Sequence, residues 1–131
     1  MTLRWYSIVI DSHDIAAQAR WWAETLDWRV EYEAADEVVI VPPHAIDKNR
    51  TIPPEEQGPG LVFVTVPEGK AVKNRLHIDL APAGDDDLGS QVALLVSRGA
   101  TTVDVGQEAD VTWVVLADPE GNEFCVLSPR D

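Results

Sequence analysis

The most constraining feature of this sequence is that its order of predicted elements repeats once along 131 residues. Each half reads as a strand, a helix and three further strands. In the first half these elements are predicted at residues 3–11, 15–26, 28–32, 37–41 and 61–66. In the second half they are predicted at residues 75–80, 88–98, 101–105, 111–117 and 123–128. We therefore expect an α+β fold of two βαβββ modules, about 1–66 and 73–131, forming a curved mixed sheet with a cleft.

Local patterns support these elements. The segments 3–11 and 75–80 alternate with a period of two, as half-buried strands do. Asp14 stands at the position of a helix N-cap, and the apolar residues that follow recur at helical spacing. Aligning the two halves places Ser7 opposite His77 and Phe63 opposite Phe124. We expect a single domain that covers residues 1–131.

The segment 42–60 is predicted to be a loop. It contains five prolines and few apolar residues, a composition that argues against any regular element there. The sequence leaves open whether this loop forms an ordered lid over the cleft.

The charge of the chain excludes two classes of partner. Ten Lys and Arg residues against 23 Asp and Glu residues give a net charge of −13. Such a field repels phosphate backbones and anionic bilayers, so neither nucleic acid nor a membrane is an expected partner. The first residues lack the apolar run of a signal peptide, and Cys125 is the only cysteine. Both features favour a cytoplasmic location.

Strand alternation predicts which side chains point into the cleft. Tyr6 is expected to face the helix of its module, and so is Leu76. The alternate residues of these strands then point into the cleft, joined by residues of the later strands. The predicted cleft residues are Trp5, Ser7, Val9, Asp11, Val62, Val64, Val66, Arg75, His77, Asp79, Glu123, Cys125 and Leu127. They should form a polar cluster beside an apolar side.

The polar cluster has two interpretations. Arg75, Asp79 and Glu123 would either form ion pairs on a solvated sheet face or contact a ligand. His77 lies between two apolar neighbours, which favours a place in the cleft, although a lone histidine is more often not a metal ligand. Cys125 would be either an inert buried thiol or a nucleophile activated by His77.

Five tryptophans in so short a chain are the second unusual feature of its composition. Trp22 lies on the apolar stripe of the first helix and is expected in the core, with Trp21 at the edge of that stripe. Trp5, Trp28 and Trp113 are placed on sheet strands, where an indole ring either fills the core or contacts a flat apolar ligand. The sequence leaves both interpretations open for Trp5 and Trp113.

Four stretches of the sequence resemble the vicinal oxygen chelate superfamily, specifically its glyoxalase-like and bleomycin-resistance-like branch. They are D-x-x-x-x-A-R-W-W-A-E-T-L-D-W at 14–28, K-N-R-L-H-I-D-L at 73–80, R-G-A-T-T-V-D-V at 98–105 and W-V-V-L-A-D-P-E-G-N-E-F-C-V-L at 113–127. The last stretch is the most specific, and together the four span nearly the whole chain. Leu26 and Asp27 stand where this family usually has Leu-Gly, a departure at a helix end. The resemblance also implies a homodimer.

Metal-using members of that superfamily hold a divalent ion with a histidine of the first strand, a histidine of the fifth and a glutamate of the last. The resemblance places Ser7, His77 and Cys125 at these positions. Only His77 is a clear ligand, whereas a divalent ion needs about three or four protein ligands. We therefore predict no metal site and no cofactor, with His77 as the only retained ligand position.

Two functions follow from the resemblance. The first is a metal-independent protein of the antibiotic-resistance type, which encloses an apolar or aromatic drug or metabolite in the cleft. The second is an enzyme, either a metal-dependent lyase, isomerase or dioxygenase or a metal-free one with His77 as general base. We expect the first, and the sequence names neither the ligand nor a reaction.

Overall fold

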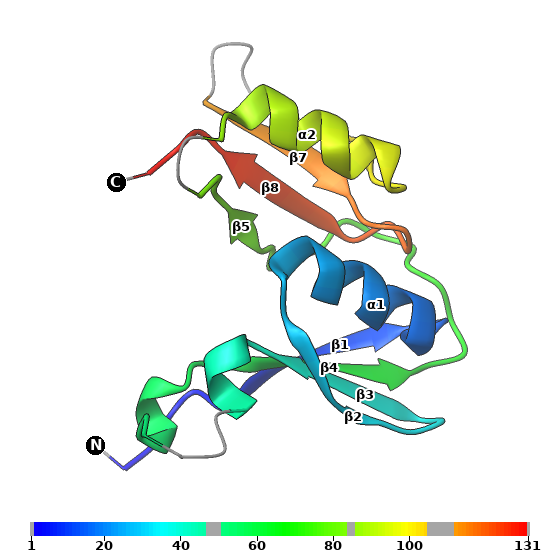
Figure 1. The fold of residues 1–131 in the computed structure, drawn as a ribbon. Helices are drawn as coiled ribbons and strands as arrows, with labels where there is room; N and C mark the ends of the chain where they lie inside the picture. Colours follow the sequence, from blue (N-terminus) through cyan, green and yellow to red (C-terminus); the bar gives the residue numbers. More distant parts are fainter. Residues whose placement is uncertain (1, 47–50, 84–85, 105–111, 131) are drawn as a thin grey trace. The chain divides into compact units, whose positions relative to one another are not determined.

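The computed structural model describes residues 2–46, 51–83, 86–104 and 112–130. The chain divides into two compact units, Met1–Gly69 and Lys70–Asp131, and the boundary falls between the two modules predicted from the repeat. In the described residues each unit holds one α-helix and one four-stranded mixed sheet (Figure 1). The predicted α+β class and its two βαβββ-like modules are confirmed.

The first unit contains β1 (Ser7–Ser12), α1 (Ile15–Leu26), β2 (Arg29–Glu33), β3 (Glu37–Val41) and β4 (Gly60–Thr65). Its strands lie in the order β1-β4-β3-β2, with β1 parallel to β4 and the other pairs antiparallel. The helix α1 covers one face of this sheet (Figure 1). It begins as predicted at Asp14, whose carboxylate accepts a hydrogen bond of 3.2 Å from the N–H of Ala17.

The end of α1 explains the departure from the Leu-Gly pattern. Asp27 has a φ of 54°, in the left-handed region that favours glycine. Its N–H donates to the carbonyls of Ala23 and Glu24, which closes the last turn of the helix. Aspartate tolerates this backbone conformation better than most residues with a side chain, so it can stand at a helix end that favours glycine.

The core of the first unit lies between α1 and the sheet. Trp22, Ile40 and Phe63 are almost fully buried there, which confirms the place predicted for Trp22. Trp21 is also buried, with its ring centroid 5.1 Å from that of Trp22 in an edge-to-face arrangement. Rings packed in this way contribute beyond the apolar area that they bury.

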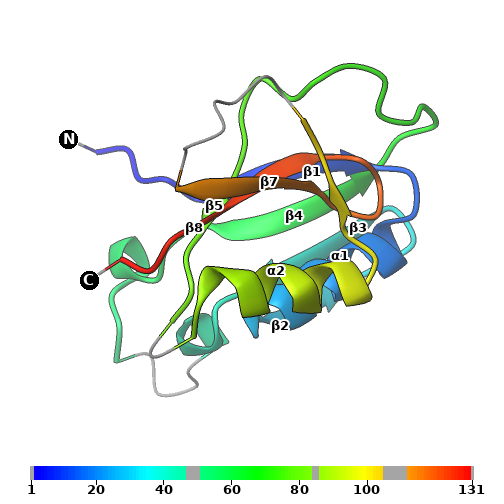
Figure 2. The same cartoon turned by 90° about the horizontal axis from the view of Figure 1, so that it is seen from above.

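The second unit contains β5 (Asp79–Leu80), α2 (Leu88–Ser97), β6 (Thr101–Thr102), β7 (Trp113–Ala117) and β8 (Glu123–Leu127). Its strands lie in the order β5-β8-β7-β6, and β5 is parallel to β8. Figure 2 shows α2 along one side of β7 and β8. The turn between these two strands follows the sequence: Asp118 accepts hydrogen bonds of 3.0 Å from the N–H groups of Glu120 and Asn122, and Gly121 has a φ of 92°.

Several predictions about regular structure are wrong. The strand expected at 3–11 begins only at Ser7, and the one expected at 101–105 covers only Thr101–Thr102 of the described residues. The strand expected at 75–80 is only two residues long, Asp79–Leu80. Leu76, expected to face the helix, lies before this strand and is 88% exposed. The loop 42–60 contains two short 3-10 helices, Pro43–Ile46 and Pro54–Glu56. Each begins with a proline, which is tolerated there because the first N–H of a helix has no partner within the helix. Residues 47–50 of the loop, like residues 105 and 111 of two predicted strands, lie outside the described residues.

No helix among the described residues is long and apolar enough to cross a membrane.

Candidate functional site

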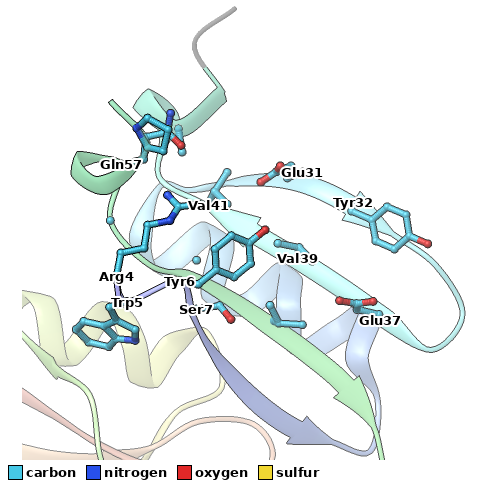
Figure 3. A pocket seen from close by; sticks show the side chains of 15 residues that line it. Arg4, Trp5, Tyr6, Ser7, Glu31, Tyr32, Glu37, Val39, Val41 and Gln57 are labelled. Atoms are coloured by element: carbon cyan, nitrogen blue, oxygen red, sulfur yellow. The ribbon is translucent and has the colours of Figure 1, made fainter. Parts of the chain in front are cut away.

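A hollow of about 340 Å³ opens on the first unit (Figure 3). It lies on the sheet face opposite α1. Its lining residues are Arg4, Trp5, Tyr6, Ser7, Glu31, Tyr32, Glu37, Val39, Val41, Ala45, Pro54, Gln57, Gly58, Gly60 and Val62. All fifteen belong to the first unit, and we call this space the hollow.

The floor of the hollow follows from strand alternation. Along β3, Val38 and Ile40 are buried toward α1, so Val39 and Val41 point to the other face. Val62 of β4 pairs with Val39 and points the same way. Three β-branched side chains from two neighbouring strands therefore give the hollow an apolar base.

Three aromatic side chains stand along the hollow. Trp5 lies at one end, Tyr32 lies at the other, and Tyr6 lies between them (Figure 3). All three are exposed, Trp5 by 66% and Tyr6 by 73%. The guanidinium carbon of Arg4 lies 5.4 Å from the centroid of the Tyr6 ring, within the range of a cation–π contact.

Tyr6 contradicts its predicted orientation. It was expected to face the helix as part of a strand, but β1 begins only at Ser7, so the alternation does not extend to it. Its carbonyl still accepts a hydrogen bond of 3.2 Å from the N–H of Gly60. The backbone before β1 is thus attached to the sheet while the ring of Tyr6 is turned toward the hollow.

The loop before β4 supplies one wall. Pro54, Gln57 and Gly58 line the hollow from this loop. The ring Nε2 of His44 lies 2.8 Å from the carbonyl oxygen of Gln57, a hydrogen bond that joins the two 3-10 helices. The described part of the loop therefore forms one wall of the hollow.

In the second unit, His77, Asp79 and Cys125 come together, and we call them the triad. Their ligand atoms all lie within 4.8 Å of one another. His77 Nε2 lies 3.1 Å from Asp79 Oδ1, and both side chains are about half exposed. Cys125 is buried, and this burial is the main reason that the pKa of its thiol is raised. The charge of Asp79 and a hydrogen bond to Asp79 raise the pKa further. The thiol form of Cys125 is thus favoured, which argues against the nucleophile interpretation.

The register of β5 on β8 explains the triad. Val9 pairs with Val62 in the first unit, so the predicted alignment of the two halves would place Asp79 opposite Glu123. Instead Asp79 pairs with Cys125. Under the predicted alignment, the register of β5 on β8 therefore differs by two residues from that of β1 on β4.

Glu123 takes part in a different contact. Its carboxylate accepts hydrogen bonds of 2.9 Å from Lys70 Nζ and from the N–H of Asn74. Burial alone would raise the pKa of Glu123, but these hydrogen bonds outweigh burial and the pKa is lowered. The side chains of Lys70 and Glu123 are both largely buried, so this pair holds the segment before β5 against β8.

The predicted site residues lie in different places in the structure. Trp5 and Ser7 line the hollow, whereas Val9, Trp28 and Val64 of the same unit do not. His77, Asp79 and Cys125 form the triad. Arg75 is exposed, and Trp113 is 37% exposed at the start of β7.

Sequence reasoning missed several lining residues. Arg4 and Tyr6 were not expected, because they precede β1. Glu31 and Tyr32 lie beside a bulge between Val30 and Tyr32, which changes the alternation of β2. A bulge leaves no signal in a period-two pattern, so nothing in the sequence indicated these two residues.

One family model matches most of the chain. The model of the glyoxalase-like domain matches residues 7–127. No curated protein sequence matches the chain.

Several solved structures share the fold. Fosfomycin resistance protein FosX from Mesorhizobium loti is 13% identical, with 99% of this chain and 95% of that chain covered and a TM-score of 0.67. FosX from Listeria monocytogenes, solved with Mn(II) and sulfate, is 8% identical, with 99% and 93% covered and a TM-score of 0.70. A glyoxalase/bleomycin resistance protein/dioxygenase family enzyme from Burkholderia phytofirmans is 15% identical, with 95% and 97% covered and a TM-score of 0.65. At these identities the likeness concerns the fold alone.

Proposed function

Because the chain belongs to the glyoxalase-like domain family, we propose that it binds a small, largely apolar or aromatic molecule in the hollow. This binding requires no metal ion. Drug or metabolite sequestration is the type of function that we assign to it, and two of the similar structures are named as fosfomycin resistance proteins.

One observation carries this proposal: exposed aromatic rings stand over an apolar floor. Trp5, Tyr6 and Tyr32 lie in water in the free protein, and a flat ligand that covers them would remove apolar surface from water. The volume of about 340 Å³ falls within the roughly 300–1,000 Å³ typical of small-molecule sites.

The two ends of the hollow carry side chains of opposite charge. Arg4 stands near Trp5 at one end, whereas Glu37 stands near Tyr32 at the other, with Glu31 at the rim (Figure 3). Groups of the ligand near Arg4 would be anionic or carbonyl oxygens, because a guanidinium donates hydrogen bonds and accepts none. The overall charge of −13 thus does not exclude an acidic ligand.

The metal positions implied by the superfamily do not fit the ion named for the Listeria protein. Ser7 offers a weakly binding hydroxyl, and Cys125 offers a buried thiol with a raised pKa where the superfamily has a carboxylate. Mn²⁺ prefers oxygen ligands such as carboxylates. His77 is then the one good ligand of the three positions.

We further propose that residues 1–131 act as one domain, in a homodimer in the cytoplasm. These proposals rest on the family resemblance and on the composition. Light scattering on the purified protein tests the dimer, and a mass of one chain would contradict it. Unfolding followed by both circular dichroism and tryptophan emission tests the single domain, since separate transitions would contradict it.

A fluorescence titration tests ligand binding. The protein is titrated with a panel of aromatic and apolar compounds, with fosfomycin included. A binding compound should change the emission of the wild type and of Trp113→Phe, but change that of Trp5→Phe much less. If no saturating compound altered the emission, or if Trp5→Phe responded like the wild type, ligand binding at the hollow would be refuted.

An enzyme is the second candidate function, favoured by the contact between His77 and Asp79. A carboxylate 3.1 Å from the imidazole can orient it as a general base. Turnover of a bound compound that is lost in His77→Ala, while the same compound still binds, would support this candidate. Turnover unchanged in His77→Ala would exclude His77 as the general base, and no turnover of any bound compound by the wild type would contradict the enzyme.

A further inference from the structure

We propose that the hollow takes an extended dipolar ligand, an apolar or aromatic molecule with a protonated amine at one end and an acidic or carbonyl group at the other. The amine lies at the end formed by Glu31, Tyr32 and Glu37, which we call the acidic end, and the oxygen group lies beside Arg4 (Figure 3). This inference rests on the proposed function, because it names the ligand class of the same hollow.

A bulge in β2 brings one of the two carboxylates to the acidic end. Neighbouring residues of a regular strand point to opposite faces, so Glu31 and Tyr32 would not share a face. Both nevertheless line the hollow. Val30 pairs with Ile40 and Tyr32 pairs with Val39, which leaves Glu31 as an extra residue of β2 with no counterpart in β3. A bulge of this kind redirects side chains, and here it places a second charged group beside the Tyr32 ring.

The charges that line the hollow do not neutralise one another. Among the described residues, no ion pair or hydrogen bond engages the carboxylate of Glu31 or Glu37, and the nearby Arg29 pairs with Asp27 instead. The guanidinium of Arg4 likewise has no carboxylate partner in the described part of the chain, and its contact is with the Tyr6 ring. A ligand can therefore approach both ends without first breaking an ion pair.

An ammonium group fits the acidic end in two ways. Ionised carboxylates accept hydrogen bonds and donate none, and an ammonium group only donates. An aromatic face also attracts a cation that lies within about 6 Å of its centroid. The ring of Tyr32 is 54% exposed, so a ligand can reach it. A neutral hydroxyl in place of the ammonium group would keep the apolar contacts and lose both attractions.

The distance between the two charged ends requires an extended ligand. Arg4 precedes β1 and Glu31 belongs to β2, and these are the outer strands of the sheet β1-β4-β3-β2. Neighbouring strands lie about 4.8 Å apart, so the outer strands of four are separated by about 14 Å. The apolar floor lies between them, and it suits a ligand whose middle part is apolar.

Calorimetric titration with three related compounds tests the ligand class. The probe is a biphenyl with an aminomethyl group at one end and a carboxylate at the other. The first analogue has a hydroxymethyl group in place of the aminomethyl group, and the second lacks the carboxylate. We expect the probe to bind at least about fivefold more tightly than either analogue, since partly exposed charge and cation–π contacts are of that order.

Variants assign each charge of the probe to one end of the hollow. Glu31→Gln combined with Glu37→Gln should weaken binding of the probe by at least about fivefold and leave binding of the hydroxymethyl analogue unchanged. Arg4→Gln should weaken binding of the probe but not of the analogue without a carboxylate. Glu33→Gln combined with Glu68→Gln is the matched control, because both glutamates are exposed and lie outside the lining of the hollow. This control has the same change in net charge and should bind the probe like the wild type.

Two results would overturn the dipolar ligand while leaving the hollow as a binding site. One is equal affinity of the wild type for the probe and the hydroxymethyl analogue. The other is a Glu31→Gln and Glu37→Gln protein that loses affinity for both compounds to the same extent. Binding of none of the three compounds would also overturn it, and the fluorescence titration with the wider set of compounds then shows whether the proposed function fails as well.

Discussion

Lys70 Nζ donates a hydrogen bond of 2.9 Å to Glu123 Oε1, although 53 positions separate the two residues in the sequence. The same carboxylate also accepts from the backbone of Asn74. One side chain of β8 thus fixes the chain that leads into β5, and with it the segment that carries His77 and Asp79.

Glu123→Gln should lower the free energy of unfolding by about 1–3 kcal/mol, because it leaves the largely buried Lys70 ammonium without its charged partner. Urea unfolding measures this difference. Glu68→Gln, at an exposed position, is the control and should unfold like the wild type. Equal stability of the two variants would show that the Lys70–Glu123 pair does not hold this segment.

Gly60→Ala should destabilise the first unit and narrow the hollow. A Cβ at this position would lie 3.1 Å from the carbonyl oxygen of Ile40 and 3.2 Å from Cγ1 of Val41, so the neighbouring strand must shift. We expect a loss of about 1–3 kcal/mol in the free energy of unfolding, as for other overpacked sites. Gly69→Ala, where a Cβ meets open space, is the matched control and should unfold like the wild type. A Gly60→Ala protein as stable as that control would contradict the close approach.

Asp87 should make the stability of α2 depend on pH in the acid range. Its carboxylate accepts hydrogen bonds from the N–H and hydroxyl of Ser90, and the backbone hydrogen bond is the main reason that the pKa of Asp87 is lowered from 3.8. A lowered folded-state pKa adds stability above the unfolded value, and that stability is lost as pH falls through the folded value. Asp87→Asn keeps a capping side chain without the charge. Thermal unfolding should show the wild type as the more stable protein at pH 7, with the difference vanishing below pH 3.8. If the difference in stability between the two proteins persisted unchanged in acid, the charge of Asp87 would not be its cause.

The sequence predicted local structure better than contacts between distant segments. Asp14, Asp118 and Gly121 act through hydrogen bonds or backbone angles within a few residues, so their roles could be inferred from the order of residues alone. Leu76 fits an alternating pattern equally well, yet it is exposed, because a pattern does not say how far a neighbouring strand extends.

The same limit applies to the candidate sites. Ser7, which lines the hollow, followed from alternation. The meeting of Asp79 with Cys125 depends on the register of β5 on β8, which alternation does not give. Asp79 was therefore expected beside His77 as a charged neighbour and not in contact with Cys125. The pairing of Glu123 with Lys70 had no signal at all, since no periodicity relates residues so far apart.

The central claim is that a small molecule binds at the hollow, and the indole N–H signals of the five tryptophans test it most directly. In a two-dimensional nitrogen–proton NMR spectrum these side chains give separate signals, and the Trp5→Phe and Trp113→Phe variants assign two of them. A compound selected by fluorescence should shift the Trp5 signal in a saturable way while leaving those of the buried Trp21 and Trp22 nearly in place. A Trp5 signal that does not move at saturation, with the Trp113 signal moving instead, would contradict the account.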